Sequence, residues 1–216
     1  MLKIFYKKVR FFYLLFAFFF IIRMMKEEIK DLNHIISGCK QGKDSAKKAL
    51  FEAFSPRMKA LCCRYLGNMQ DAEDVMIDGF ISVYENIGKY KDNNFYGWIY
   101  RIMANSCIAY LKRQNKFLFK DDDEFFESDS ETEIDNIQRF SKEDLMQALL
   151  SLPQSYRIVF NMAVMDDYSY EDICTELSLE KQTVKTMMYR ARKKLRDYLT
   201  ETEKSRSETD EDRRII

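Results

Sequence analysis

The sequence predicts an all-α protein of two helical domains joined by a flexible acidic linker, with a helix-turn-helix in the C-terminal domain. Few residues interrupt helices, since the 216 residues include only 2 prolines and 6 glycines. Apolar residues recur at intervals of three and four along most of the chain, which is the spacing of one helix face. A dense acidic segment breaks this periodicity and divides the chain into two parts.

The first 24 residues differ from the rest of the chain. Basic residues precede an uninterrupted apolar run over residues 11–22. As a helix this run spans about 18 Å, well short of the roughly 30 Å hydrocarbon core of a bilayer. It is compatible with a short membrane tether, an exported precursor or translated upstream sequence. Because helices of cytosolic type follow directly, we expect the third, with residues 1–24 outside the native protein and the start at Met24 or Met25.

Three helices are predicted at the beginning of the N-terminal domain. An apolar stripe over residues 29–36 predicts a helix that ends at Gly38, and the next helix is expected to begin at Asp44. Ser55-Pro56 has the composition of an N-cap followed by proline at the first helical position, so a third helix is expected there. Gly67 is its predicted C-terminal stop.

Two longer helices complete this domain, which is predicted to span residues 25–116. Residues 71–87 carry a broad apolar face at helical spacing. Acidic side chains crowd the first turns of this helix, where they suit the helix dipole: Asp71, Glu73, Asp74 and Asp78. The last predicted helix covers residues 95–115, with Ile99, Ile102, Met103 and Tyr110 on its inner stripe.

The flexible linker is predicted over residues 117–141. Between Lys120 and Asp144 acidic residues far outnumber basic ones, and no apolar stripe is present. Such a segment repels itself and cannot bury enough apolar surface to fold alone. A C-terminal domain is then predicted over residues 142–200, followed by a charged tail over residues 201–216.

A helix-turn-helix is predicted near the C-terminal end. Ser169, followed three residues later by Asp172, approximates a capping box and opens a short helix. Residues 178–180 are short enough to form the tight turn. In the helix after the turn, apolar residues at intervals of four, three and four predict one buried face: Val184, Met188, Ala191 and Leu195. A helix of this kind fits the major groove of DNA.

The other face of that helix is polar and basic. Short polar side chains near its N-terminus can read base edges, and cations neutralise phosphates. We assign base reading to Gln182, Thr183 and Thr186. Lys185, Arg190 and Lys193 are assigned mainly to phosphate or mixed contacts, and Lys181 belongs to the same DNA-binding set. The plainer alternative is a solvated basic surface helix, but the capped helix and tight turn before it argue against that.

Composition argues against several other functions. The formal net charge is +0, which alone would argue against a nucleic-acid binder, but the charges lie in blocks. The five cysteines are scattered and His34 is the single histidine, so we expect reduced cytosolic thiols and no metal site. The sequence has no phosphate-cradling glycine loop and no nucleophile with a plausible histidine partner. We therefore expect no enzymatic activity, no cofactor and no small-molecule substrate.

Motifs in both halves of the chain resemble one family. Those of the C-terminal half are Leu149 to Phe160, Ser169-Tyr170-Glu171-Asp172-Ile173, Thr183-Val184-Lys185 and Tyr189-Arg190-Ala191-Arg192-Lys193-Lys194-Leu195. Those of the N-terminal half are Phe54-Ser55-Pro56-Arg57, Asp71-Ala72-Glu73-Asp74-Val75, Phe80, Phe95, Trp98-Ile99-Tyr100-Arg101-Ile102 and Asn105. In this order and spacing they resemble bacterial RNA polymerase sigma factors of the extracytoplasmic-function (ECF) subfamily. Apart from the linker, the resemblance covers nearly all of residues 44–199.

The resemblance implies a cytoplasmic transcription initiation factor that binds core RNA polymerase and promoter DNA. The N-terminal domain would correspond to sigma region 2, and the C-terminal domain to sigma region 4, which reads the minus-thirty-five duplex. The implied contacts on the polymerase are the β′ clamp helices and the β flap, and an anti-sigma factor is a further implied partner. The residues that would face the clamp helices are Asp71, Glu73, Asp74 and Asp78.

The helix after the acidic one would carry the melted minus-ten strand. Aromatic rings stack on unpaired bases while cations follow the backbone. The implied residues are Tyr96, Trp98, Tyr100, Arg101, Asn105, Lys112 and Arg113. Plainer roles are open for several of them: Trp98 as core, Asn105 in an internal hydrogen bond, and Tyr96 and Tyr100 as partly exposed surface.

Two other functions stay open at this point. A helix-turn-helix transcriptional regulator without a polymerase-docking role would not need the aromatic and basic helix. A membrane-anchored interaction protein is suggested only by residues 11–22. Ala109, Ser178 and Met187 depart from the family pattern and leave the promoter specificity open.

Overall fold

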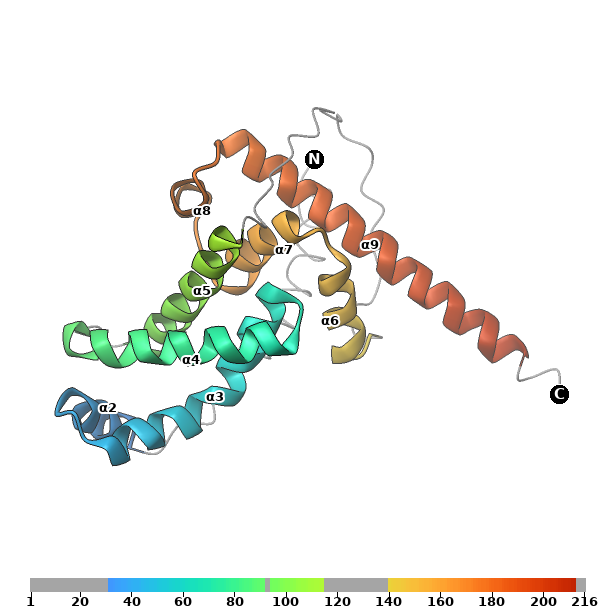
Figure 1. Cartoon of the computed structure of the whole chain (residues 1–216). Helices are drawn as coiled ribbons and strands as arrows, with labels where there is room; N and C mark the ends of the chain where they lie inside the picture. Colours follow the sequence, from blue (N-terminus) through green and yellow to red (C-terminus); the bar gives the residue numbers. More distant parts are fainter. Residues whose placement is uncertain (1–30, 92–93, 115–139, 213–216) are drawn as a thin grey trace, which may run out of the picture. The chain divides into compact units, whose positions relative to one another are not determined.

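The computed structural model describes residues 31–91, 94–114 and 140–212. These residues are helical almost throughout, and no strand occurs among them. The described residues separate into two compact units, with residues 31–91 and 94–114 in one and residues 140–212 in the other. Figure 1 shows the helices of both. The prediction of an all-α protein with two helical domains is confirmed.

The N-terminal unit consists of α2 (Leu32–Lys40), α3 (Asp44–Leu66), α4 (Met69–Asn86) and α5 (Phe95–Arg113), with a short 3-10 turn, η1 (Ile87–Lys89), after α4. Helices α3, α4 and α5 pack against one another, and α2 packs against α3 (Figure 1). Fully buried apolar side chains fill the space between these helices: Leu50, Phe54, Met58, Leu61, Tyr65, Phe80, Ile99, Met103, Ile108 and Leu111.

Helix α3 runs without interruption through Pro56, so the predicted separate helix beginning at Ser55-Pro56 is wrong. A proline inside a helix removes a backbone hydrogen bond and costs about 3 kcal/mol. Leu50, Phe54 and Met58 form one buried stripe on both sides of it. Burying each such side chain contributes roughly 1.5–3 kcal/mol, so packing outweighs the cost of the proline. Figure 1 shows α3 changing direction along its length, as expected for a helix that contains proline.

Helix α2 continues past Gly38, which we predicted as its end. Gly38 is buried where α2 meets α3, and a Cβ atom there would lie 2.6 Å from the Cβ of Ala46. The absence of a side chain therefore permits the close approach of the two helices. The chain turns at Gly42 instead, whose φ of 76° lies in the left-handed region. Gly67, with a φ of 81°, ends α3 as predicted.

Helix α4 begins two residues before its predicted start, because Asn68 caps it. The Asn68 side chain accepts a hydrogen bond of 2.8 Å from the backbone N–H of Asp71. Farther along α4, the Tyr84 hydroxyl donates to the backbone carbonyl of Lys47 in α3 at 2.9 Å. This hydrogen bond links α4 to α3 in addition to their apolar contact. Burial raises the pKa of Tyr84 to about 12.

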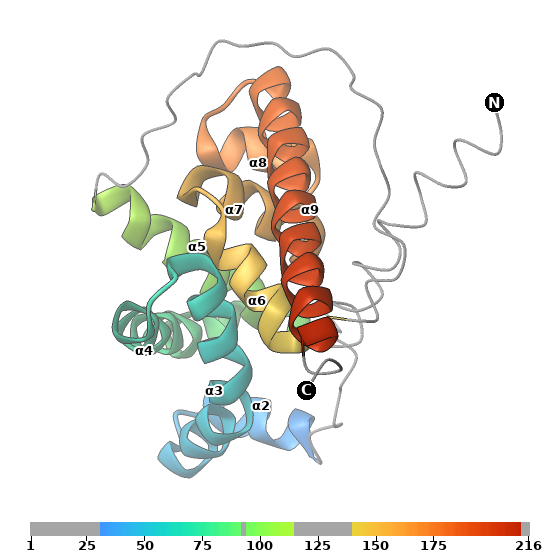
Figure 2. The same ribbon diagram turned by 90° about the vertical axis from the view of Figure 1, so that its right-hand side faces the viewer.

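The C-terminal unit consists of α6 (Lys142–Ser151), α7 (Gln154–Phe160), the π-helical turn η3 (Asn161–Met165), α8 (Tyr170–Leu177) and α9 (Lys181–Asp212). Helix α9 packs against α6, α7 and α8, and Figure 2 shows it lying along the unit. The unit is therefore organised around one long helix.

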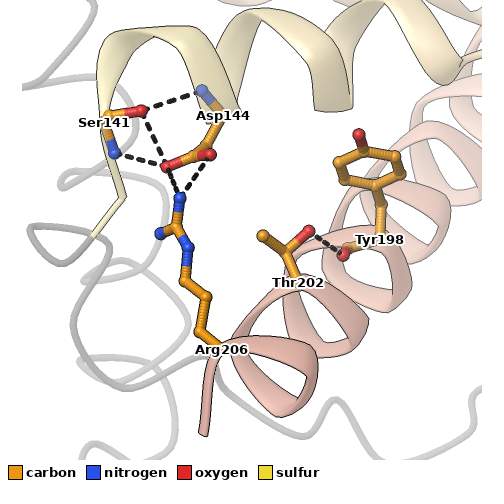
Figure 3. Close-up of polar contacts among 5 residues, drawn as sticks. All are labelled: Ser141, Asp144, Tyr198, Thr202 and Arg206. Carbon is orange, nitrogen blue, oxygen red and sulfur yellow. Dashed lines mark hydrogen bonds and ion pairs between the residues drawn. The ribbon is translucent and has the colours of Figure 1, made fainter. Parts of the chain in front are cut away.

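Helix α9 extends past residue 200 into the segment that we predicted as a charged tail. Toward its far end the Nη2 atom of Arg206 lies 2.8 and 2.9 Å from the two carboxylate oxygens of Asp144 in α6 (Figure 3). Asp144 also forms a capping box with Ser141. The Asp144 carboxylate accepts from the Ser141 backbone N–H at 2.8 Å, and the Asp144 N–H donates to the Ser141 hydroxyl at 3.1 Å. The far part of α9 therefore belongs to the folded unit.

The predicted leader, residues 1–24, and all of the predicted linker except Phe140 and Ser141 lie outside the described residues. Phe140 is buried, and Ser141 begins the C-terminal unit as the N-cap of α6. Within the described ranges, no helix combines the length and the hydropathy that crossing a membrane requires.

Candidate nucleic-acid and protein interfaces

Helices α8 and α9 form the predicted helix-turn-helix. The Ser169 hydroxyl accepts from the backbone N–H of Asp172 at 3.0 Å, and the Asp172 carboxylate accepts from the N–H of Ser169 at 3.1 Å, so the predicted capping box is confirmed. Ser178 stands in the turn with a φ of 56°. A non-glycine residue in this left-handed conformation costs roughly 1–2 kcal/mol, and the tight turn requires it.

One face of α9 is buried against the rest of its unit, and this orients the opposite face. The buried side chains are Val184, Met187, Met188, Ala191, Leu195 and Leu199. The four that we predicted as buried are confirmed. Met187, which departs from the family pattern, is buried on the same face. Of the predicted DNA-binding set, Lys181, Gln182, Lys185 and Lys193 are exposed, whereas Thr183, Thr186 and Arg190 are half-buried.

Three members of this set make contacts within the protein. Lys181 forms an ion pair with Glu171 of α8. The Thr186 hydroxyl donates to the backbone carbonyl of Gln182 at 3.0 Å. The Nη1 atom of Arg190 donates to the hydroxyl of Tyr156 in α7 at 3.3 Å. The Arg190 guanidinium is therefore oriented by α7.

Part of the predicted single-strand set lies along one face of α5. Trp98, Arg101, Asn105 and Lys112 are three, four and seven residues apart, which places them on the same side of the helix. The last three side chains are exposed, and so is Arg113 at the end of the helix. The structure thus brings an aromatic ring, two cations and an amide together along one stripe.

The two tyrosines of that set lie on the other side of α5. Tyr96 and Tyr100 continue the stripe of Met103 and Cys107, which are buried. The Tyr96 ring lies 5.3 Å from that of Phe54, and the guanidinium of Arg57 lies 5.8 Å from the Tyr96 ring centroid. The Tyr96 ring therefore has two neighbours on α3.

Trp98 lies between these two environments. Its ring centroid is 5.3 Å from that of Tyr90 and 5.4 Å from that of Phe95, and the side chain is half-buried. The core contacts hold the indole in place, and Trp98 is the first residue of the stripe formed with Arg101 and Asn105. A ring held in this way loses little conformational freedom when a base stacks on it.

The acidic residues of α4 differ in their surroundings. Asp71 accepts from the Asn68 side chain at 2.7 Å, and its hydrogen bond with Tyr110 raises the pKa of that phenol. Glu73 forms an ion pair with Lys59 of α3. Asp74 and Asp78 are exposed on the outer surface of α4. Asp74 and Asp78 therefore present part of the acidic charge of this helix to solvent.

Sequence reasoning missed an apolar component of the same surface. Ile77 and Ile81 are 51% and 50% exposed, and Met69 is 56% exposed. All three belong to α4 and, at intervals of eight and four residues, lie on one side of it. The sequence contained a signal, since Ile77 and Ile81 are out of phase with the buried stripe of Val75, Phe80 and Val83. Exposed apolar side chains that gather on one side of a helix, bordered by polar residues, are a candidate protein-binding surface.

In the part of the chain that the structure describes, no group of three or more His, Cys, Asp or Glu side chains is arranged to hold an ion. The five cysteine thiols are unlinked, and Cys39, Cys62 and Cys107 are buried.

Comparison with known proteins places two families on the chain in order. Residues 50–117 match Sigma-70 region 2, and residues 142–195 match Sigma-70 region 4. The ECF RNA polymerase sigma factor SigE of Mycolicibacterium smegmatis is 32% identical over 69% of this chain and 60% of its own length. The ECF RNA polymerase sigma factor SigW of Bacillus subtilis is 28% identical over 82% of this chain and 97% of its own length. The ECF RNA polymerase sigma-E factor of Escherichia coli is 27% identical over 78% of this chain and 93% of its own length.

Proposed function

The chain belongs to the ECF family of RNA polymerase sigma factors, and on that premise we propose how its surfaces divide the work of transcription initiation. As a family member it directs promoter-specific initiation. We propose that it does so as a cytoplasmic, non-enzymatic subunit that binds core RNA polymerase through the N-terminal unit and promoter DNA through both units.

The outer surface of α4 is the proposed contact with core polymerase. Ile77 and Ile81 supply apolar area, while Asp74 and Asp78 supply charge that would orient the approach to a basic partner such as the β′ clamp helices. Asp71 and Glu73 make contacts within the unit, so we assign them a smaller share of this interface.

The exposed stripe of α5 is the proposed minus-ten surface. Trp98 would stack on an unpaired base, Arg101 and Lys112 would follow the phosphates, and Asn105 would hydrogen-bond to a base edge. Arg113 adds a cation at the end of the stripe. Tyr96 and Tyr100 support this surface from the other side of the helix.

The exposed face of α9 is the proposed minus-thirty-five surface. Gln182, at the N-terminal end of the helix, would read bases, with Thr183 and Thr186 at the margin of the contact. Lys185 and Lys193 would bind phosphates. The β flap and an anti-sigma factor are proposed as further partners, on the basis of the family alone.

The observation that carries this proposal is the presence of both domains, in order, in one chain. A promoter-binding regulator would need the helix-turn-helix but not an aromatic and basic α5 stripe beside an acidic and apolar α4 surface. The test is run-off transcription with purified core polymerase on genomic fragments, with and without this protein. We expect discrete transcripts only when the protein is added, and their absence on every fragment would overturn the proposal.

A further inference from the structure

Glu171 and Lys181 form an ion pair that joins the two helices of the helix-turn-helix. Glu171 lies in the first turn of α8, and Lys181 is the first residue of α9. The Lys181 Nζ and a Glu171 carboxylate oxygen are within hydrogen-bonding distance. The side chains remain 57% and 68% exposed, so the pair lies on the surface. In a helix-turn-helix, the N-terminal end of the recognition helix contacts base edges, and Lys181 lies at that end of α9.

The Lys181 charge is unfavourable at the start of α9 without Glu171, whereas the Glu171 charge suits the first turn of α8 and becomes unfavourable only beside DNA phosphates. A lysine at a helix N-terminus opposes the helix dipole, and a carboxylate on a DNA-binding surface repels phosphates. The hydrogen bond raises the pKa of Lys181, and the same bond lowers the pKa of Glu171. Both groups are therefore charged at neutral pH.

We propose that Glu171 is a positioning residue that sets DNA specificity by holding Lys181 in one place at the leading end of α9. This rests on the proposed reading of duplex DNA by the C-terminal unit. On the DNA sequence that the C-terminal unit recognises, Lys181 contacts DNA while still paired with Glu171. On any other sequence, Lys181 must leave Glu171 to reach a phosphate, and the exposed Glu171 carboxylate then repels the DNA backbone. Only mismatched DNA incurs that penalty.

The test compares two short duplexes: one selected from a random pool by the wild-type holoenzyme, and a scrambled version of it. The Kd of the whole chain for each is measured by fluorescence anisotropy over a fourfold range of KCl concentration. In Glu171→Gln we expect tighter binding of the scrambled duplex and a salt dependence steeper by about one phosphate contact. That corresponds to roughly a threefold larger change in Kd across the salt range. Binding of the selected duplex should change by less than about twofold, so the specificity ratio falls.

Two further variants separate positioning from net charge. Glu180→Gln removes the same charge from the neighbouring turn, where Glu180 is exposed, and should leave the ratio near that of the wild type. Adding Lys181→Ala to Glu171→Gln should abolish the gain in binding to scrambled DNA. Equal ratios for Glu171→Gln and Glu180→Gln would overturn the inference while leaving the proposed function in place. A wild-type chain that binds both duplexes equally would remove the proposed role of the C-terminal unit, and the inference with it.

Discussion

The guanidinium of Arg206 contacts both carboxylate oxygens of Asp144, although 62 positions separate the two residues in the chain. The Asp144 side chain is 14% exposed and that of Arg206 is 52% exposed. The same carboxylate completes the capping box with Ser141. One acidic group therefore stabilises the beginning of α6 and ties it to the far part of α9, which joins the start of the C-terminal unit to its end.

Arg206→Gln should loosen both ends of this connection. We expect faster amide hydrogen exchange in the first turn of α6 and in the far part of α9. The acceleration should stay below about tenfold, because a partly exposed ion pair contributes roughly 1 kcal/mol or less. Lys204→Gln removes the same charge from an exposed site on α9 and serves as the control. Identical exchange in the two variants would mean that the contact with Asp144 has no stabilising effect.

The stability of the C-terminal unit should depend on pH through Asp144. Partial burial alone would raise the pKa of this carboxyl, but hydrogen bonds from Ser141 and Arg206 outweigh burial and lower it. The contribution is therefore complete above the unfolded pKa of about 3.9 and is lost as the pH falls through the lower folded pKa. In urea unfolding, Asp144→Asn should be less stable than the wild type at pH 6. That difference should shrink below pH of about 4, and a constant difference would exclude this linkage.

Replacing Ile77 and Ile81 with serine should weaken binding to core RNA polymerase without unfolding the protein. Both side chains are about half exposed, so little core is lost, whereas anchors at an interface typically contribute more than about 1 kcal/mol. We expect the Kd for core polymerase, measured by biolayer interferometry, to rise about fivefold or more.

Exchanging Asp74 and Asp78 for lysine should chiefly slow association with core polymerase, because exposed charges mainly affect the rate of encounter. Ile35→Ser, at a half-buried isoleucine of α2, is the control for the serine variants of Ile77 and Ile81. Wild-type binding kinetics in both the serine and the lysine variants of α4 would remove α4 from the interface.

Gly38→Ala should destabilise the N-terminal unit by about 1–3 kcal/mol in spite of the higher helix propensity of alanine. The new Cβ would lie 2.6 Å from the Cβ of Ala46, so α2 and α3 must move apart. Gly88→Ala is the matched control, since a Cβ at Gly88 meets no atom within 4 Å. Urea unfolding followed by circular dichroism should separate the two, and equal midpoints would contradict the close-packing role of Gly38.

Arg190→Ala should weaken promoter binding across sequences and reduce the slope of log K against log salt by about one. Tyr156→Phe keeps the charge of Arg190 but removes its hydroxyl partner. This variant should lower the affinity while leaving the slope unchanged. If Arg190→Ala also leaves the slope unchanged, Arg190 links α9 to α7 and does not bind phosphate.

Local chemistry explains which features of the fold could be predicted. Ser169 and Asp172 act within one turn of helix, and Gly67 ends α3 through its own backbone freedom, so both were visible in the sequence. Pro56 and Gly38 misled prediction because their local preferences were outweighed by packing against residues on other helices. The long reach of α9 was missed because Arg206 is stabilised by Asp144, which is distant in sequence.

The same distinction applies to the candidate sites. Apolar periodicity identified the buried and exposed faces of α9. The same periodicity contained an overlooked signal on α4, where Ile77 and Ile81 are out of phase with the buried residues. Residue type alone could not separate Trp98 from Tyr96 on α5, because that depends on which side of the helix meets α3. The assignments to polymerase and DNA remain predictions.

Because α9 is a single helix, the distance from Lys181 to Arg206 is set by the helix rise at about 38 Å. A tilt of a few degrees at the DNA-reading end therefore becomes a displacement of ångströms at the far end. A fluorophore or spin label at Lys204 would read out the docking angle of the recognition helix from a position remote from the bases. The displacement of a label on the far part of α9 would therefore report the tilt of this helix when the protein binds a promoter in solution.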